Sequence, residues 1–170
     1  MKIFLCFTLF LGLSVLVAGQ IVKEKSINQN IAAAQTLSEE DTIREVVFRR
    51  IIDPWLVGEP IRPRRFYLSI DDGKNPSVGL LKKLSDINAT LKKVTESYIS
   101  HPEGSIVLDK KTKKQGDRFS VSKLKWITKD EVKLSAGSYS GNMGSDSCEF
   151  TLRKDNGNWK IISEEKCVIS

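Results

Sequence analysis

The apolar side chains after residue 38 recur at helical spacing. Ser38 is a favourable N-cap, and acidic residues follow it where the helix dipole favours negative charge. Pro54 cannot continue a helix, so the pattern predicts a helix from about Ser38 to Pro54. At about 100° per residue its apolar side chains cover a wide arc, which predicts packing on more than one side. These side chains are Ile43, Val46, Val47, Phe48, Ile51 and Ile52.

A short strand and a short second helix are predicted next. Phe66–Ile70 has the composition of a strand, and Asp71-Asp72-Gly73 has that of a turn. Asn75 followed by Pro76 predicts the N-cap and first position of a helix. The segment 89–97 fits either a strand or an extended loop.

The last third of the chain predicts antiparallel strands near 106–108, 118–127, 131–141, 148–154 and 159–163. Asn156-Gly157 is typical of the turn of a β-hairpin. The alternation of apolar residues shifts by one position between 121 and 124, and again near Gly137, so we expect a β-bulge at each place. The resulting fold class is α+β: the N-terminal helix packs in the concave side of a strongly curved, bulged antiparallel sheet of four to six strands.

Several segments resemble the nuclear-transport-factor-2-like superfamily, the cone-shaped fold of ketosteroid isomerase and scytalone dehydratase. They are REVVFRR, FYLSID, NPSVGLLKKL, LKKVTES, FSVSKLKWITKDEVKLSAGSY and EFTLRKDNGNWKI. They look most like an uncharacterised branch of exported bacterial members, and the likeness covers roughly residues 38–165. The resemblance implies a cone, but this fold hosts both enzymes and binding modules, so it implies no particular activity.

The first nineteen residues have the three-part layout of a secretory signal peptide. Lys2 precedes an apolar run, and Val17-Ala18-Gly19 offers small residues for cleavage, which would leave Gln20 first. The alternatives are cleavage after Ala18 and an uncleaved anchor. We therefore divide the chain into a signal peptide (1–19), a flexible tether (20–36) and one domain (37–170), secreted or periplasmic, with no transmembrane segment after the signal is removed.

The two cysteines of the mature chain, Cys148 and Cys167, predict a disulfide in an oxidising compartment. A hairpin centred on Asn156-Gly157 places Leu152 opposite Ile161 and leaves Cys167 two residues beyond the partner of Cys148. Such a diagonal spans about 7–8 Å, which is too long for a disulfide. The bridge therefore requires a register shift, a bulge or a bend after residue 163. The alternative is two separate buried thiols.

Charge and composition point to no obvious ligand. Lys and Arg number 27 against 21 Asp and Glu, and the lysines at 110, 111, 113 and 114 lack the interleaved aromatic residues of a nucleic-acid site. We expect these lysines to be solvated and expect no nucleic-acid partner. With His101 as the single histidine and no Gly-rich phosphate loop, we also expect no metal and no cofactor.

Five residues are candidates for the lining of a pocket. Arg44 and Arg50 lie within the apolar arc of the first helix and could bind an anionic group, or else pair with carboxylates of the sheet. Trp126, Tyr139 and Trp159 could surround an apolar ligand or fill the core.

No set of side chains suggests a catalytic site, so the sequence favours an exported, non-enzymatic module. Its expected ligand is a small apolar molecule or a protein partner, with a homodimer as one form of the latter. A pocket enzyme of the isomerase or dehydratase kind and a structural domain of the cell envelope are the alternatives. The last of these expects the cone to be filled by its own side chains.

Overall fold

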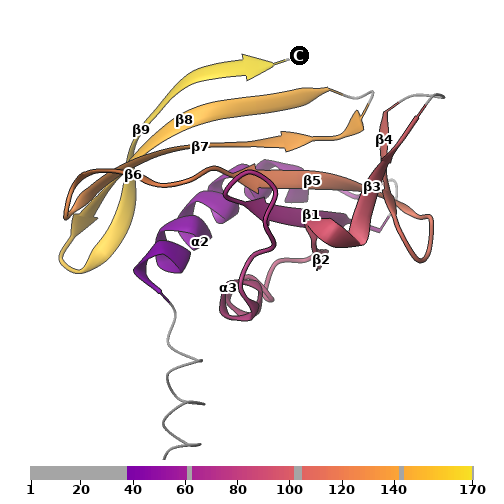
Figure 1. Cartoon of the computed structure of the whole chain (residues 1–170), viewed down its shortest axis with the longest axis horizontal. Helices are drawn as coiled ribbons and strands as arrows, with labels where there is room; N and C mark the ends of the chain where they lie inside the picture. The colour runs from indigo at the N-terminus through magenta and orange to yellow at the C-terminus, as the bar shows by residue number, and fades with distance from the viewer. Residues whose placement is uncertain (1–37, 61–62, 102–104, 142–143, 170) are drawn as a thin grey trace, which may run out of the picture. The chain divides into compact units, whose positions relative to one another are not determined.

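The first long helix, α2 (Glu39–Ile52), forms where the sequence predicts it. Ser38 accepts a hydrogen bond from the Asp41 amide at 3.1 Å, which confirms the N-cap. A 3-10 turn, η1 (Asp53–Leu56), follows and contains Pro54. The computed structural model describes residues 38–60, 63–101, 105–141 and 144–169 (Figure 1). The expected signal peptide (1–19) and tether (20–36) lie outside these residues.

The next strand and helix are also present, but the helix begins later than predicted. β1 (Arg65–Ile70) is followed by α3 (Val78–Lys83). Ser77 caps α3 by accepting a hydrogen bond from the Leu80 amide at 3.0 Å. Asn75 does not cap it, because its side chain accepts a hydrogen bond from the Thr95 amide at 3.3 Å instead.

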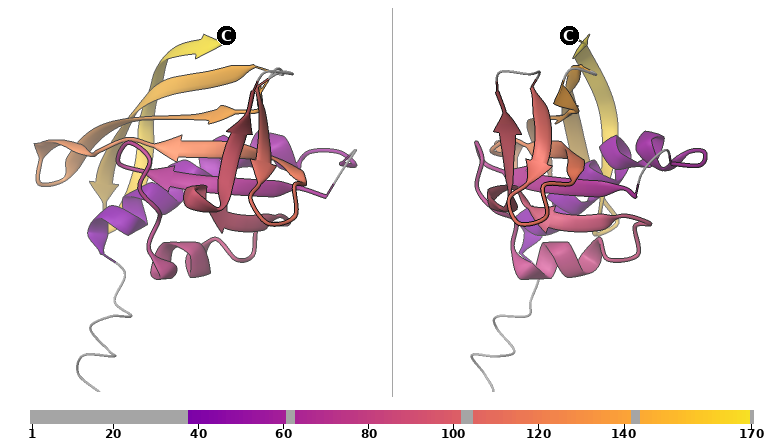
Figure 2. Two further views of the ribbon diagram at one scale, coloured as in Figure 1. Left: turned by 45° about the vertical axis from the view of Figure 1, so that its right-hand side comes forward. Right: turned by 90° about the vertical axis from the view of Figure 1, so that its right-hand side faces the viewer.

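The strands form one mixed, mostly antiparallel sheet. Its main order is β2-β1-β5-β7-β8-β9; β4 pairs with both β3 and β5, and β6 pairs with β7. Figure 2 shows the β3–β4 hairpin, which joins the sheet at the N-terminal end of β5. The further elements are β2 (Thr90–Lys93), η2 (Val94–Glu96), β3 (Ser97–Ser100), β4 (Ile106–Asp109), β5 (Gln115–Val121), β6 (Lys125–Thr128), β7 (Glu131–Tyr139), β8 (Ser145–Asp155) and β9 (Asn158–Ile169).

Two features of this sheet correct the prediction. It has nine strands over the described residues instead of four to six, and β1 pairs in parallel with both β2 and β5. β1, α3 and β2 therefore form a parallel βαβ unit, which an all-antiparallel prediction excludes. Burial of apolar side chains stabilises this unit: Leu80, Leu84 and Ile87, from the connection between β1 and β2, pack into the same hydrophobic core as the sheet.

The first predicted bulge is confirmed and the second is wrong. Val121 of β5 pairs with Ala136 and Lys125 of β6 pairs with Lys133, so four steps along this part of the chain oppose three on β7. The single strand predicted over 118–127 is divided at this place into β5 and β6. β7, in contrast, pairs with β8 in a single register over all nine of its residues. The pattern shifts near Gly137 because Tyr139 lies on the face away from α2, where its hydroxyl donates to the Ser105 carbonyl oxygen at 3.2 Å.

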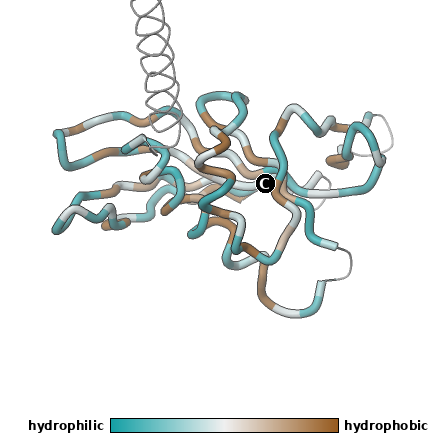
Figure 3. Tube along the Cα trace, turned by 90° about the horizontal axis from the view of Figure 1, so that it is seen from below, coloured by the Kyte–Doolittle hydropathy of each residue, from teal (hydrophilic) through white to brown (hydrophobic). Residues whose placement is uncertain are grey.

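The face of the sheet beneath α2 is filled with apolar side chains. Ile43, Val47, Phe48 and Ile52 of α2 are fully buried against this face. Hydrophobic and hydrophilic stretches alternate along the strands, as expected for a sheet with one covered face (Figure 3). The core is completed by Phe66, Leu68, Ile70, Leu80, Leu84, Ile87, Phe119, Val121, Val132, Leu134, Ala136, Phe150, Leu152 and Trp159.

Among the described residues, no helix combines the length and the apolar character needed to cross a membrane.

Candidate functional site

The two candidate arginines of α2 are both paired with carboxylates. Arg44 is buried and contacts Glu40 at 2.9 Å, Asp71 at 3.0 Å and Asp41 at 3.6 Å. It therefore ties α2 to the turn after β1. Arg50 is half-exposed and contacts Glu164 of β9 through two nitrogens, each 2.9 Å from Oε2.

The three candidate aromatic residues do not share one cavity with these arginines. Trp126 and Trp159 meet edge to face, with ring centroids 5.7 Å apart. Trp159 belongs to the core near the first turn of α2, where its ring lies below the Lys154 ammonium. Tyr139 lies on the opposite face of the sheet. Of the five predicted pocket residues only Trp126 and Trp159 thus lie together, and the space under α2 that could have joined all five is occupied by the core.

A groove of about 580 Å³ lies elsewhere on the domain. Arg64 shapes one side of it by donating hydrogen bonds to the carbonyl oxygens of Leu56 and Gly58, at 3.0 and 2.7 Å. None of the five predicted pocket residues lines this groove. Its lining is Leu56, Gly58, Glu59, Pro60, Pro63, Arg64, Ile87, Asn88, Ala89 and Thr90.

Cys148 and Cys167 are joined, and the register change required by the sequence argument is present. Leu152 pairs with Ile161, as predicted. Ile162 is then an extra residue, and Lys166, at φ +50°, is a second. The two shifts move Cys167 opposite Cys148, with Cα atoms 4.1 Å apart. Two bulges in β9 therefore provide the geometry that a regular hairpin lacks.

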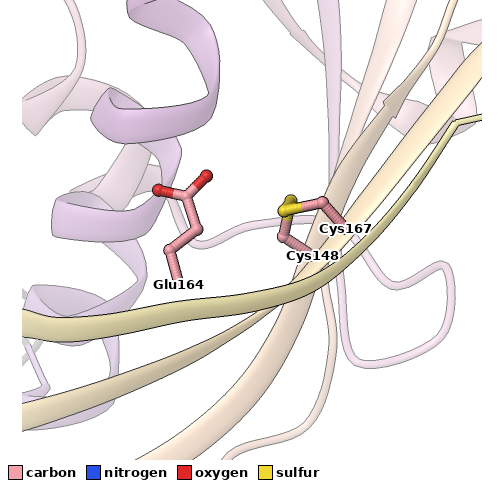
Figure 4. Close-up of side chains that lie close together, drawn as sticks. All are labelled: Cys148, Glu164 and Cys167. Atoms are coloured by element: carbon pink, nitrogen blue, oxygen red, sulfur yellow. A yellow bond between two sulfur atoms is a disulfide. The ribbon is translucent and has the colours of Figure 1, made fainter.

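Glu164 lies on the same face of the sheet as this disulfide. Figure 4 shows its carboxylate projecting toward α2 beside the two sulfur atoms. One ligand atom from each of Glu164, Cys148 and Cys167 lies within 4.8 Å of the other two. Sequence reasoning did not find this group, because Glu164 reaches the same face as the cysteines only through the bulges of β9.

A second cluster of polar groups is centred on the buried carboxylate of Asp109. Its Oδ2 accepts hydrogen bonds from the Tyr67 hydroxyl at 3.0 Å and from the Lys92 ammonium at 2.6 Å. Its Oδ1 accepts from the amides of Lys111 and Thr112 at 3.0 and 2.8 Å. Every oxygen of the carboxylate is therefore satisfied by groups from β1, β2 and the turn after β4.

This environment fixes the protonation of both acidic groups. The Lys92 ammonium and the turn amides hold the pKa of Asp109 well below its usual range. Burial, reinforced by the hydrogen bond to Asp109, raises the pKa of Tyr67. The pair is thus a carboxylate and a neutral phenol at physiological pH. Tyr67 and Asp109 are buried, so their hydrogen bond holds neighbouring elements in place.

The Asp109 cluster fixes the conformation of the lysine turn, which we define as residues 110–114. Asp109 bonds two of its amides, and the Lys110 amide donates to the Glu96 carbonyl oxygen at 2.8 Å. Lys113 takes φ +58° and places its ammonium 4.9 Å from the centroid of the Tyr98 ring. The four lysines of the turn are exposed, and none of them forms an ion pair with a carboxylate of the described residues.

Gly116 makes this arrangement sterically feasible. A Cβ at this position would lie 2.5 Å from the Arg65 carbonyl oxygen and 2.7 Å from the edge of the Tyr67 ring. Only glycine lets the ring lie directly on β5. The signal was present in the sequence as a glycine two residues after a lysine run, but it gains meaning only once β1 is known to pair with β5.

Comparison with protein-family models, with curated proteins and with solved structures finds no match to this chain.

Proposed function

We propose that the chain is an exported, non-enzymatic domain of the nuclear-transport-factor-2-like kind that binds an anionic membrane surface through the lysine turn. The observation that carries the proposal is the buried Asp109 carboxylate, which holds the turn in one conformation. A fixed turn loses little conformational entropy when its lysines meet a charged surface.

The filled core argues against a small apolar ligand under α2. Val47, Phe48 and Ile52 occupy that space with no exposed area. The position of Tyr67 argues against catalysis, because its hydroxyl is fully buried with Asp109. Among the classes considered, an accessory domain of the cell envelope fits these observations best.

Electrostatics sets the expected strength of binding. A lysine near an anionic membrane surface contributes about 1 kcal/mol, so the four lysines contribute about 4 kcal/mol, or roughly a thousandfold in affinity. Tyr98 supports Lys113 from below and is a residue type that favours the membrane interface.

Vesicle binding tests the proposal. The full chain is titrated with vesicles of phosphatidylglycerol and phosphatidylcholine, and with vesicles of phosphatidylcholine alone. We expect binding only to the first kind, decreasing as salt is raised. Replacing Lys110, Lys111, Lys113 and Lys114 by Glu should abolish this binding.

A matched variant separates the turn from net charge. Glu replacing the exposed Lys82, Lys83, Lys123 and Lys129 changes the total charge equally but leaves the lysine turn intact. We expect it to retain most of the binding. Equal losses in both variants would refute a role for the turn. Binding of the chain to soluble polyphosphate but not to the anionic vesicles would refute the membrane as its target.

A further inference from the structure

The disulfide face of β9 carries three potential metal ligands. Cys148, Cys167 and Glu164 come from two adjacent strands and project to the same side (Figure 4). Their ligand atoms lie within 4.8 Å of one another. In the oxidised protein the sulfur atoms are bonded to each other and cannot act as thiolate ligands.

We propose that reduction of this disulfide creates a binding site for a zinc-class divalent cation, with Cys148, Cys167 and Glu164 as ligands. The site exists in only one redox state, so the same two sulfur atoms serve as a covalent crosslink or as a metal ligand pair. This inference is independent of the proposed membrane function.

The chemistry balances with one external reductant. A dithiol reduces the disulfide to two protein thiols and becomes a disulfide itself, transferring two electrons and two protons. The cation then displaces one proton from each thiol and forms two metal–thiolate bonds. The carboxylate of Glu164 supplies the third ligand without losing a proton, and water completes a tetrahedral set.

The geometry needs only small side-chain movements. With metal–sulfur bonds of about 2.3 Å and metal–oxygen bonds of about 2.1 Å, tetrahedral ligands lie roughly 3.6–3.8 Å apart. The sulfur atoms must separate to this distance, and Glu164 must approach them by about 1 Å to reach it. Cys148 and Cys167 lie opposite each other, with Cα atoms 4.1 Å apart, and Glu164 lies opposite Phe150, the next β8 residue on the same face as Cys148. Both movements fit rotations about the side-chain bonds of residues placed in this way.

Arg50 supports the site from α2. Its two nitrogens bind Oε2 of Glu164, and no donor among the described residues bonds Oε1, which leaves that oxygen for the cation. An outer hydrogen bond of this kind orients a ligating carboxylate. Two thiolates and one carboxylate carry three negative charges, which the divalent cation and the Arg50 guanidinium together neutralise.

The site is accessible to a reductant and to a metal ion. Cys167 and Glu164 are exposed, and Cys148 is partly exposed. β9 ends the main strand order of the sheet, so no further strand covers this side among the described residues. An exposed disulfide is more readily reduced than one sealed in the core.

Cobalt titration of the full chain tests the proposal. The protein is reduced with a phosphine, the reductant is removed without air, and Co²⁺ is added. We expect thiolate-to-cobalt charge-transfer absorbance and tetrahedral d–d bands that saturate at one equivalent, and Zn²⁺ should displace the cobalt. The oxidised protein should show neither signal.

Two glutamate variants give the decisive comparison. Glu164→Gln should weaken cobalt binding by about tenfold or more, whereas Glu165→Gln, which alters the neighbouring residue, should leave it unchanged. Circular dichroism of each reduced variant verifies that it is folded. Absence of charge-transfer absorbance in folded, reduced wild-type protein would overturn the site. Equal affinities of the two glutamine variants would overturn the role of Glu164.

Discussion

Removing the disulfide should destabilise the domain by an amount that follows from the size of its loop. Cys148 and Cys167 are 19 residues apart, and closing such a loop lowers the entropy of the unfolded chain. The chain-entropy model gives about 3 kcal/mol for this length at 25 °C. The double variant Cys148→Ala/Cys167→Ala should therefore lose about 3 kcal/mol of unfolding free energy and remain folded, because domains are typically stable by about 5–15 kcal/mol.

Urea unfolding followed by tryptophan fluorescence measures this loss. With a denaturant slope of about 2 kcal/mol per molar, the midpoint should fall by about 1.5 M. Wild-type protein with its disulfide reduced, in the absence of metal, should match the double variant and thereby control for the substituted side chains. An unchanged midpoint in the reduced wild type would refute the loop argument. A loss in the double variant alone would assign the effect to packing.

Three further predictions concern other parts of the chain. Gly137→Ala should destabilise the domain by about 3 kcal/mol or more, because its Cβ would lie 1.9 Å from the Asp146 carbonyl oxygen; Ser135→Ala, on the same face of β7, is the control in thermal unfolding. Folding lowers the pKa of Asp109, so its ionised carboxylate stabilises the folded domain fully at pH values above the unfolded pKa of about 3.9. This stabilisation is lost as pH falls through the folded pKa. Urea midpoints measured below pH 5 should therefore drop more in wild type than in Asp109→Asn. N-terminal sequencing of exported protein should begin near Gln20, and an intact Met1 on cytoplasmic protein would contradict the signal peptide.

Local patterns in the sequence predicted the parts of the fold that depend on neighbouring residues. The N-cap at Ser38 and the hairpin turn at Asn156-Gly157 are confirmed. Asn156 and Gly157 both have positive φ, +48° and +81°, as this type of turn requires. The parallel neighbours of β1 could not be predicted in this way. Residues 65–68 pair with 90–93, and residues 66–70 pair with 117–121. The composition of a strand does not indicate which distant segment it pairs with.

In the candidate site, too, local features could be predicted from the sequence and contacts between distant segments could not. The disulfide was predictable because an exported chain with two cysteines favours their pairing, and the hairpin register predicted that the pairing needs an irregular strand. The structure supplies this irregularity with two bulges. The Asp109 cluster was missed because Tyr67, Lys92 and Asp109 meet only across the parallel pairing. The predicted pocket was wrong because its residues were chosen by type, without knowing which face of the sheet each side chain lies on. Tyr139 lies on the opposite face from Trp159.

The two bulges in β9 also affect how the protein behaves at high concentration. A straight strand of this length at the end of a sheet would present a continuous row of backbone groups to a second molecule, which is a common start of aggregation. Ile162 and Lys166 interrupt that row and divide β9 into short stretches. The exposed side chains of Val168 and Ile169 are thus separated from the rest of the strand by an irregular backbone. The irregularities that align the cysteines therefore also limit open-ended assembly through this edge of the sheet.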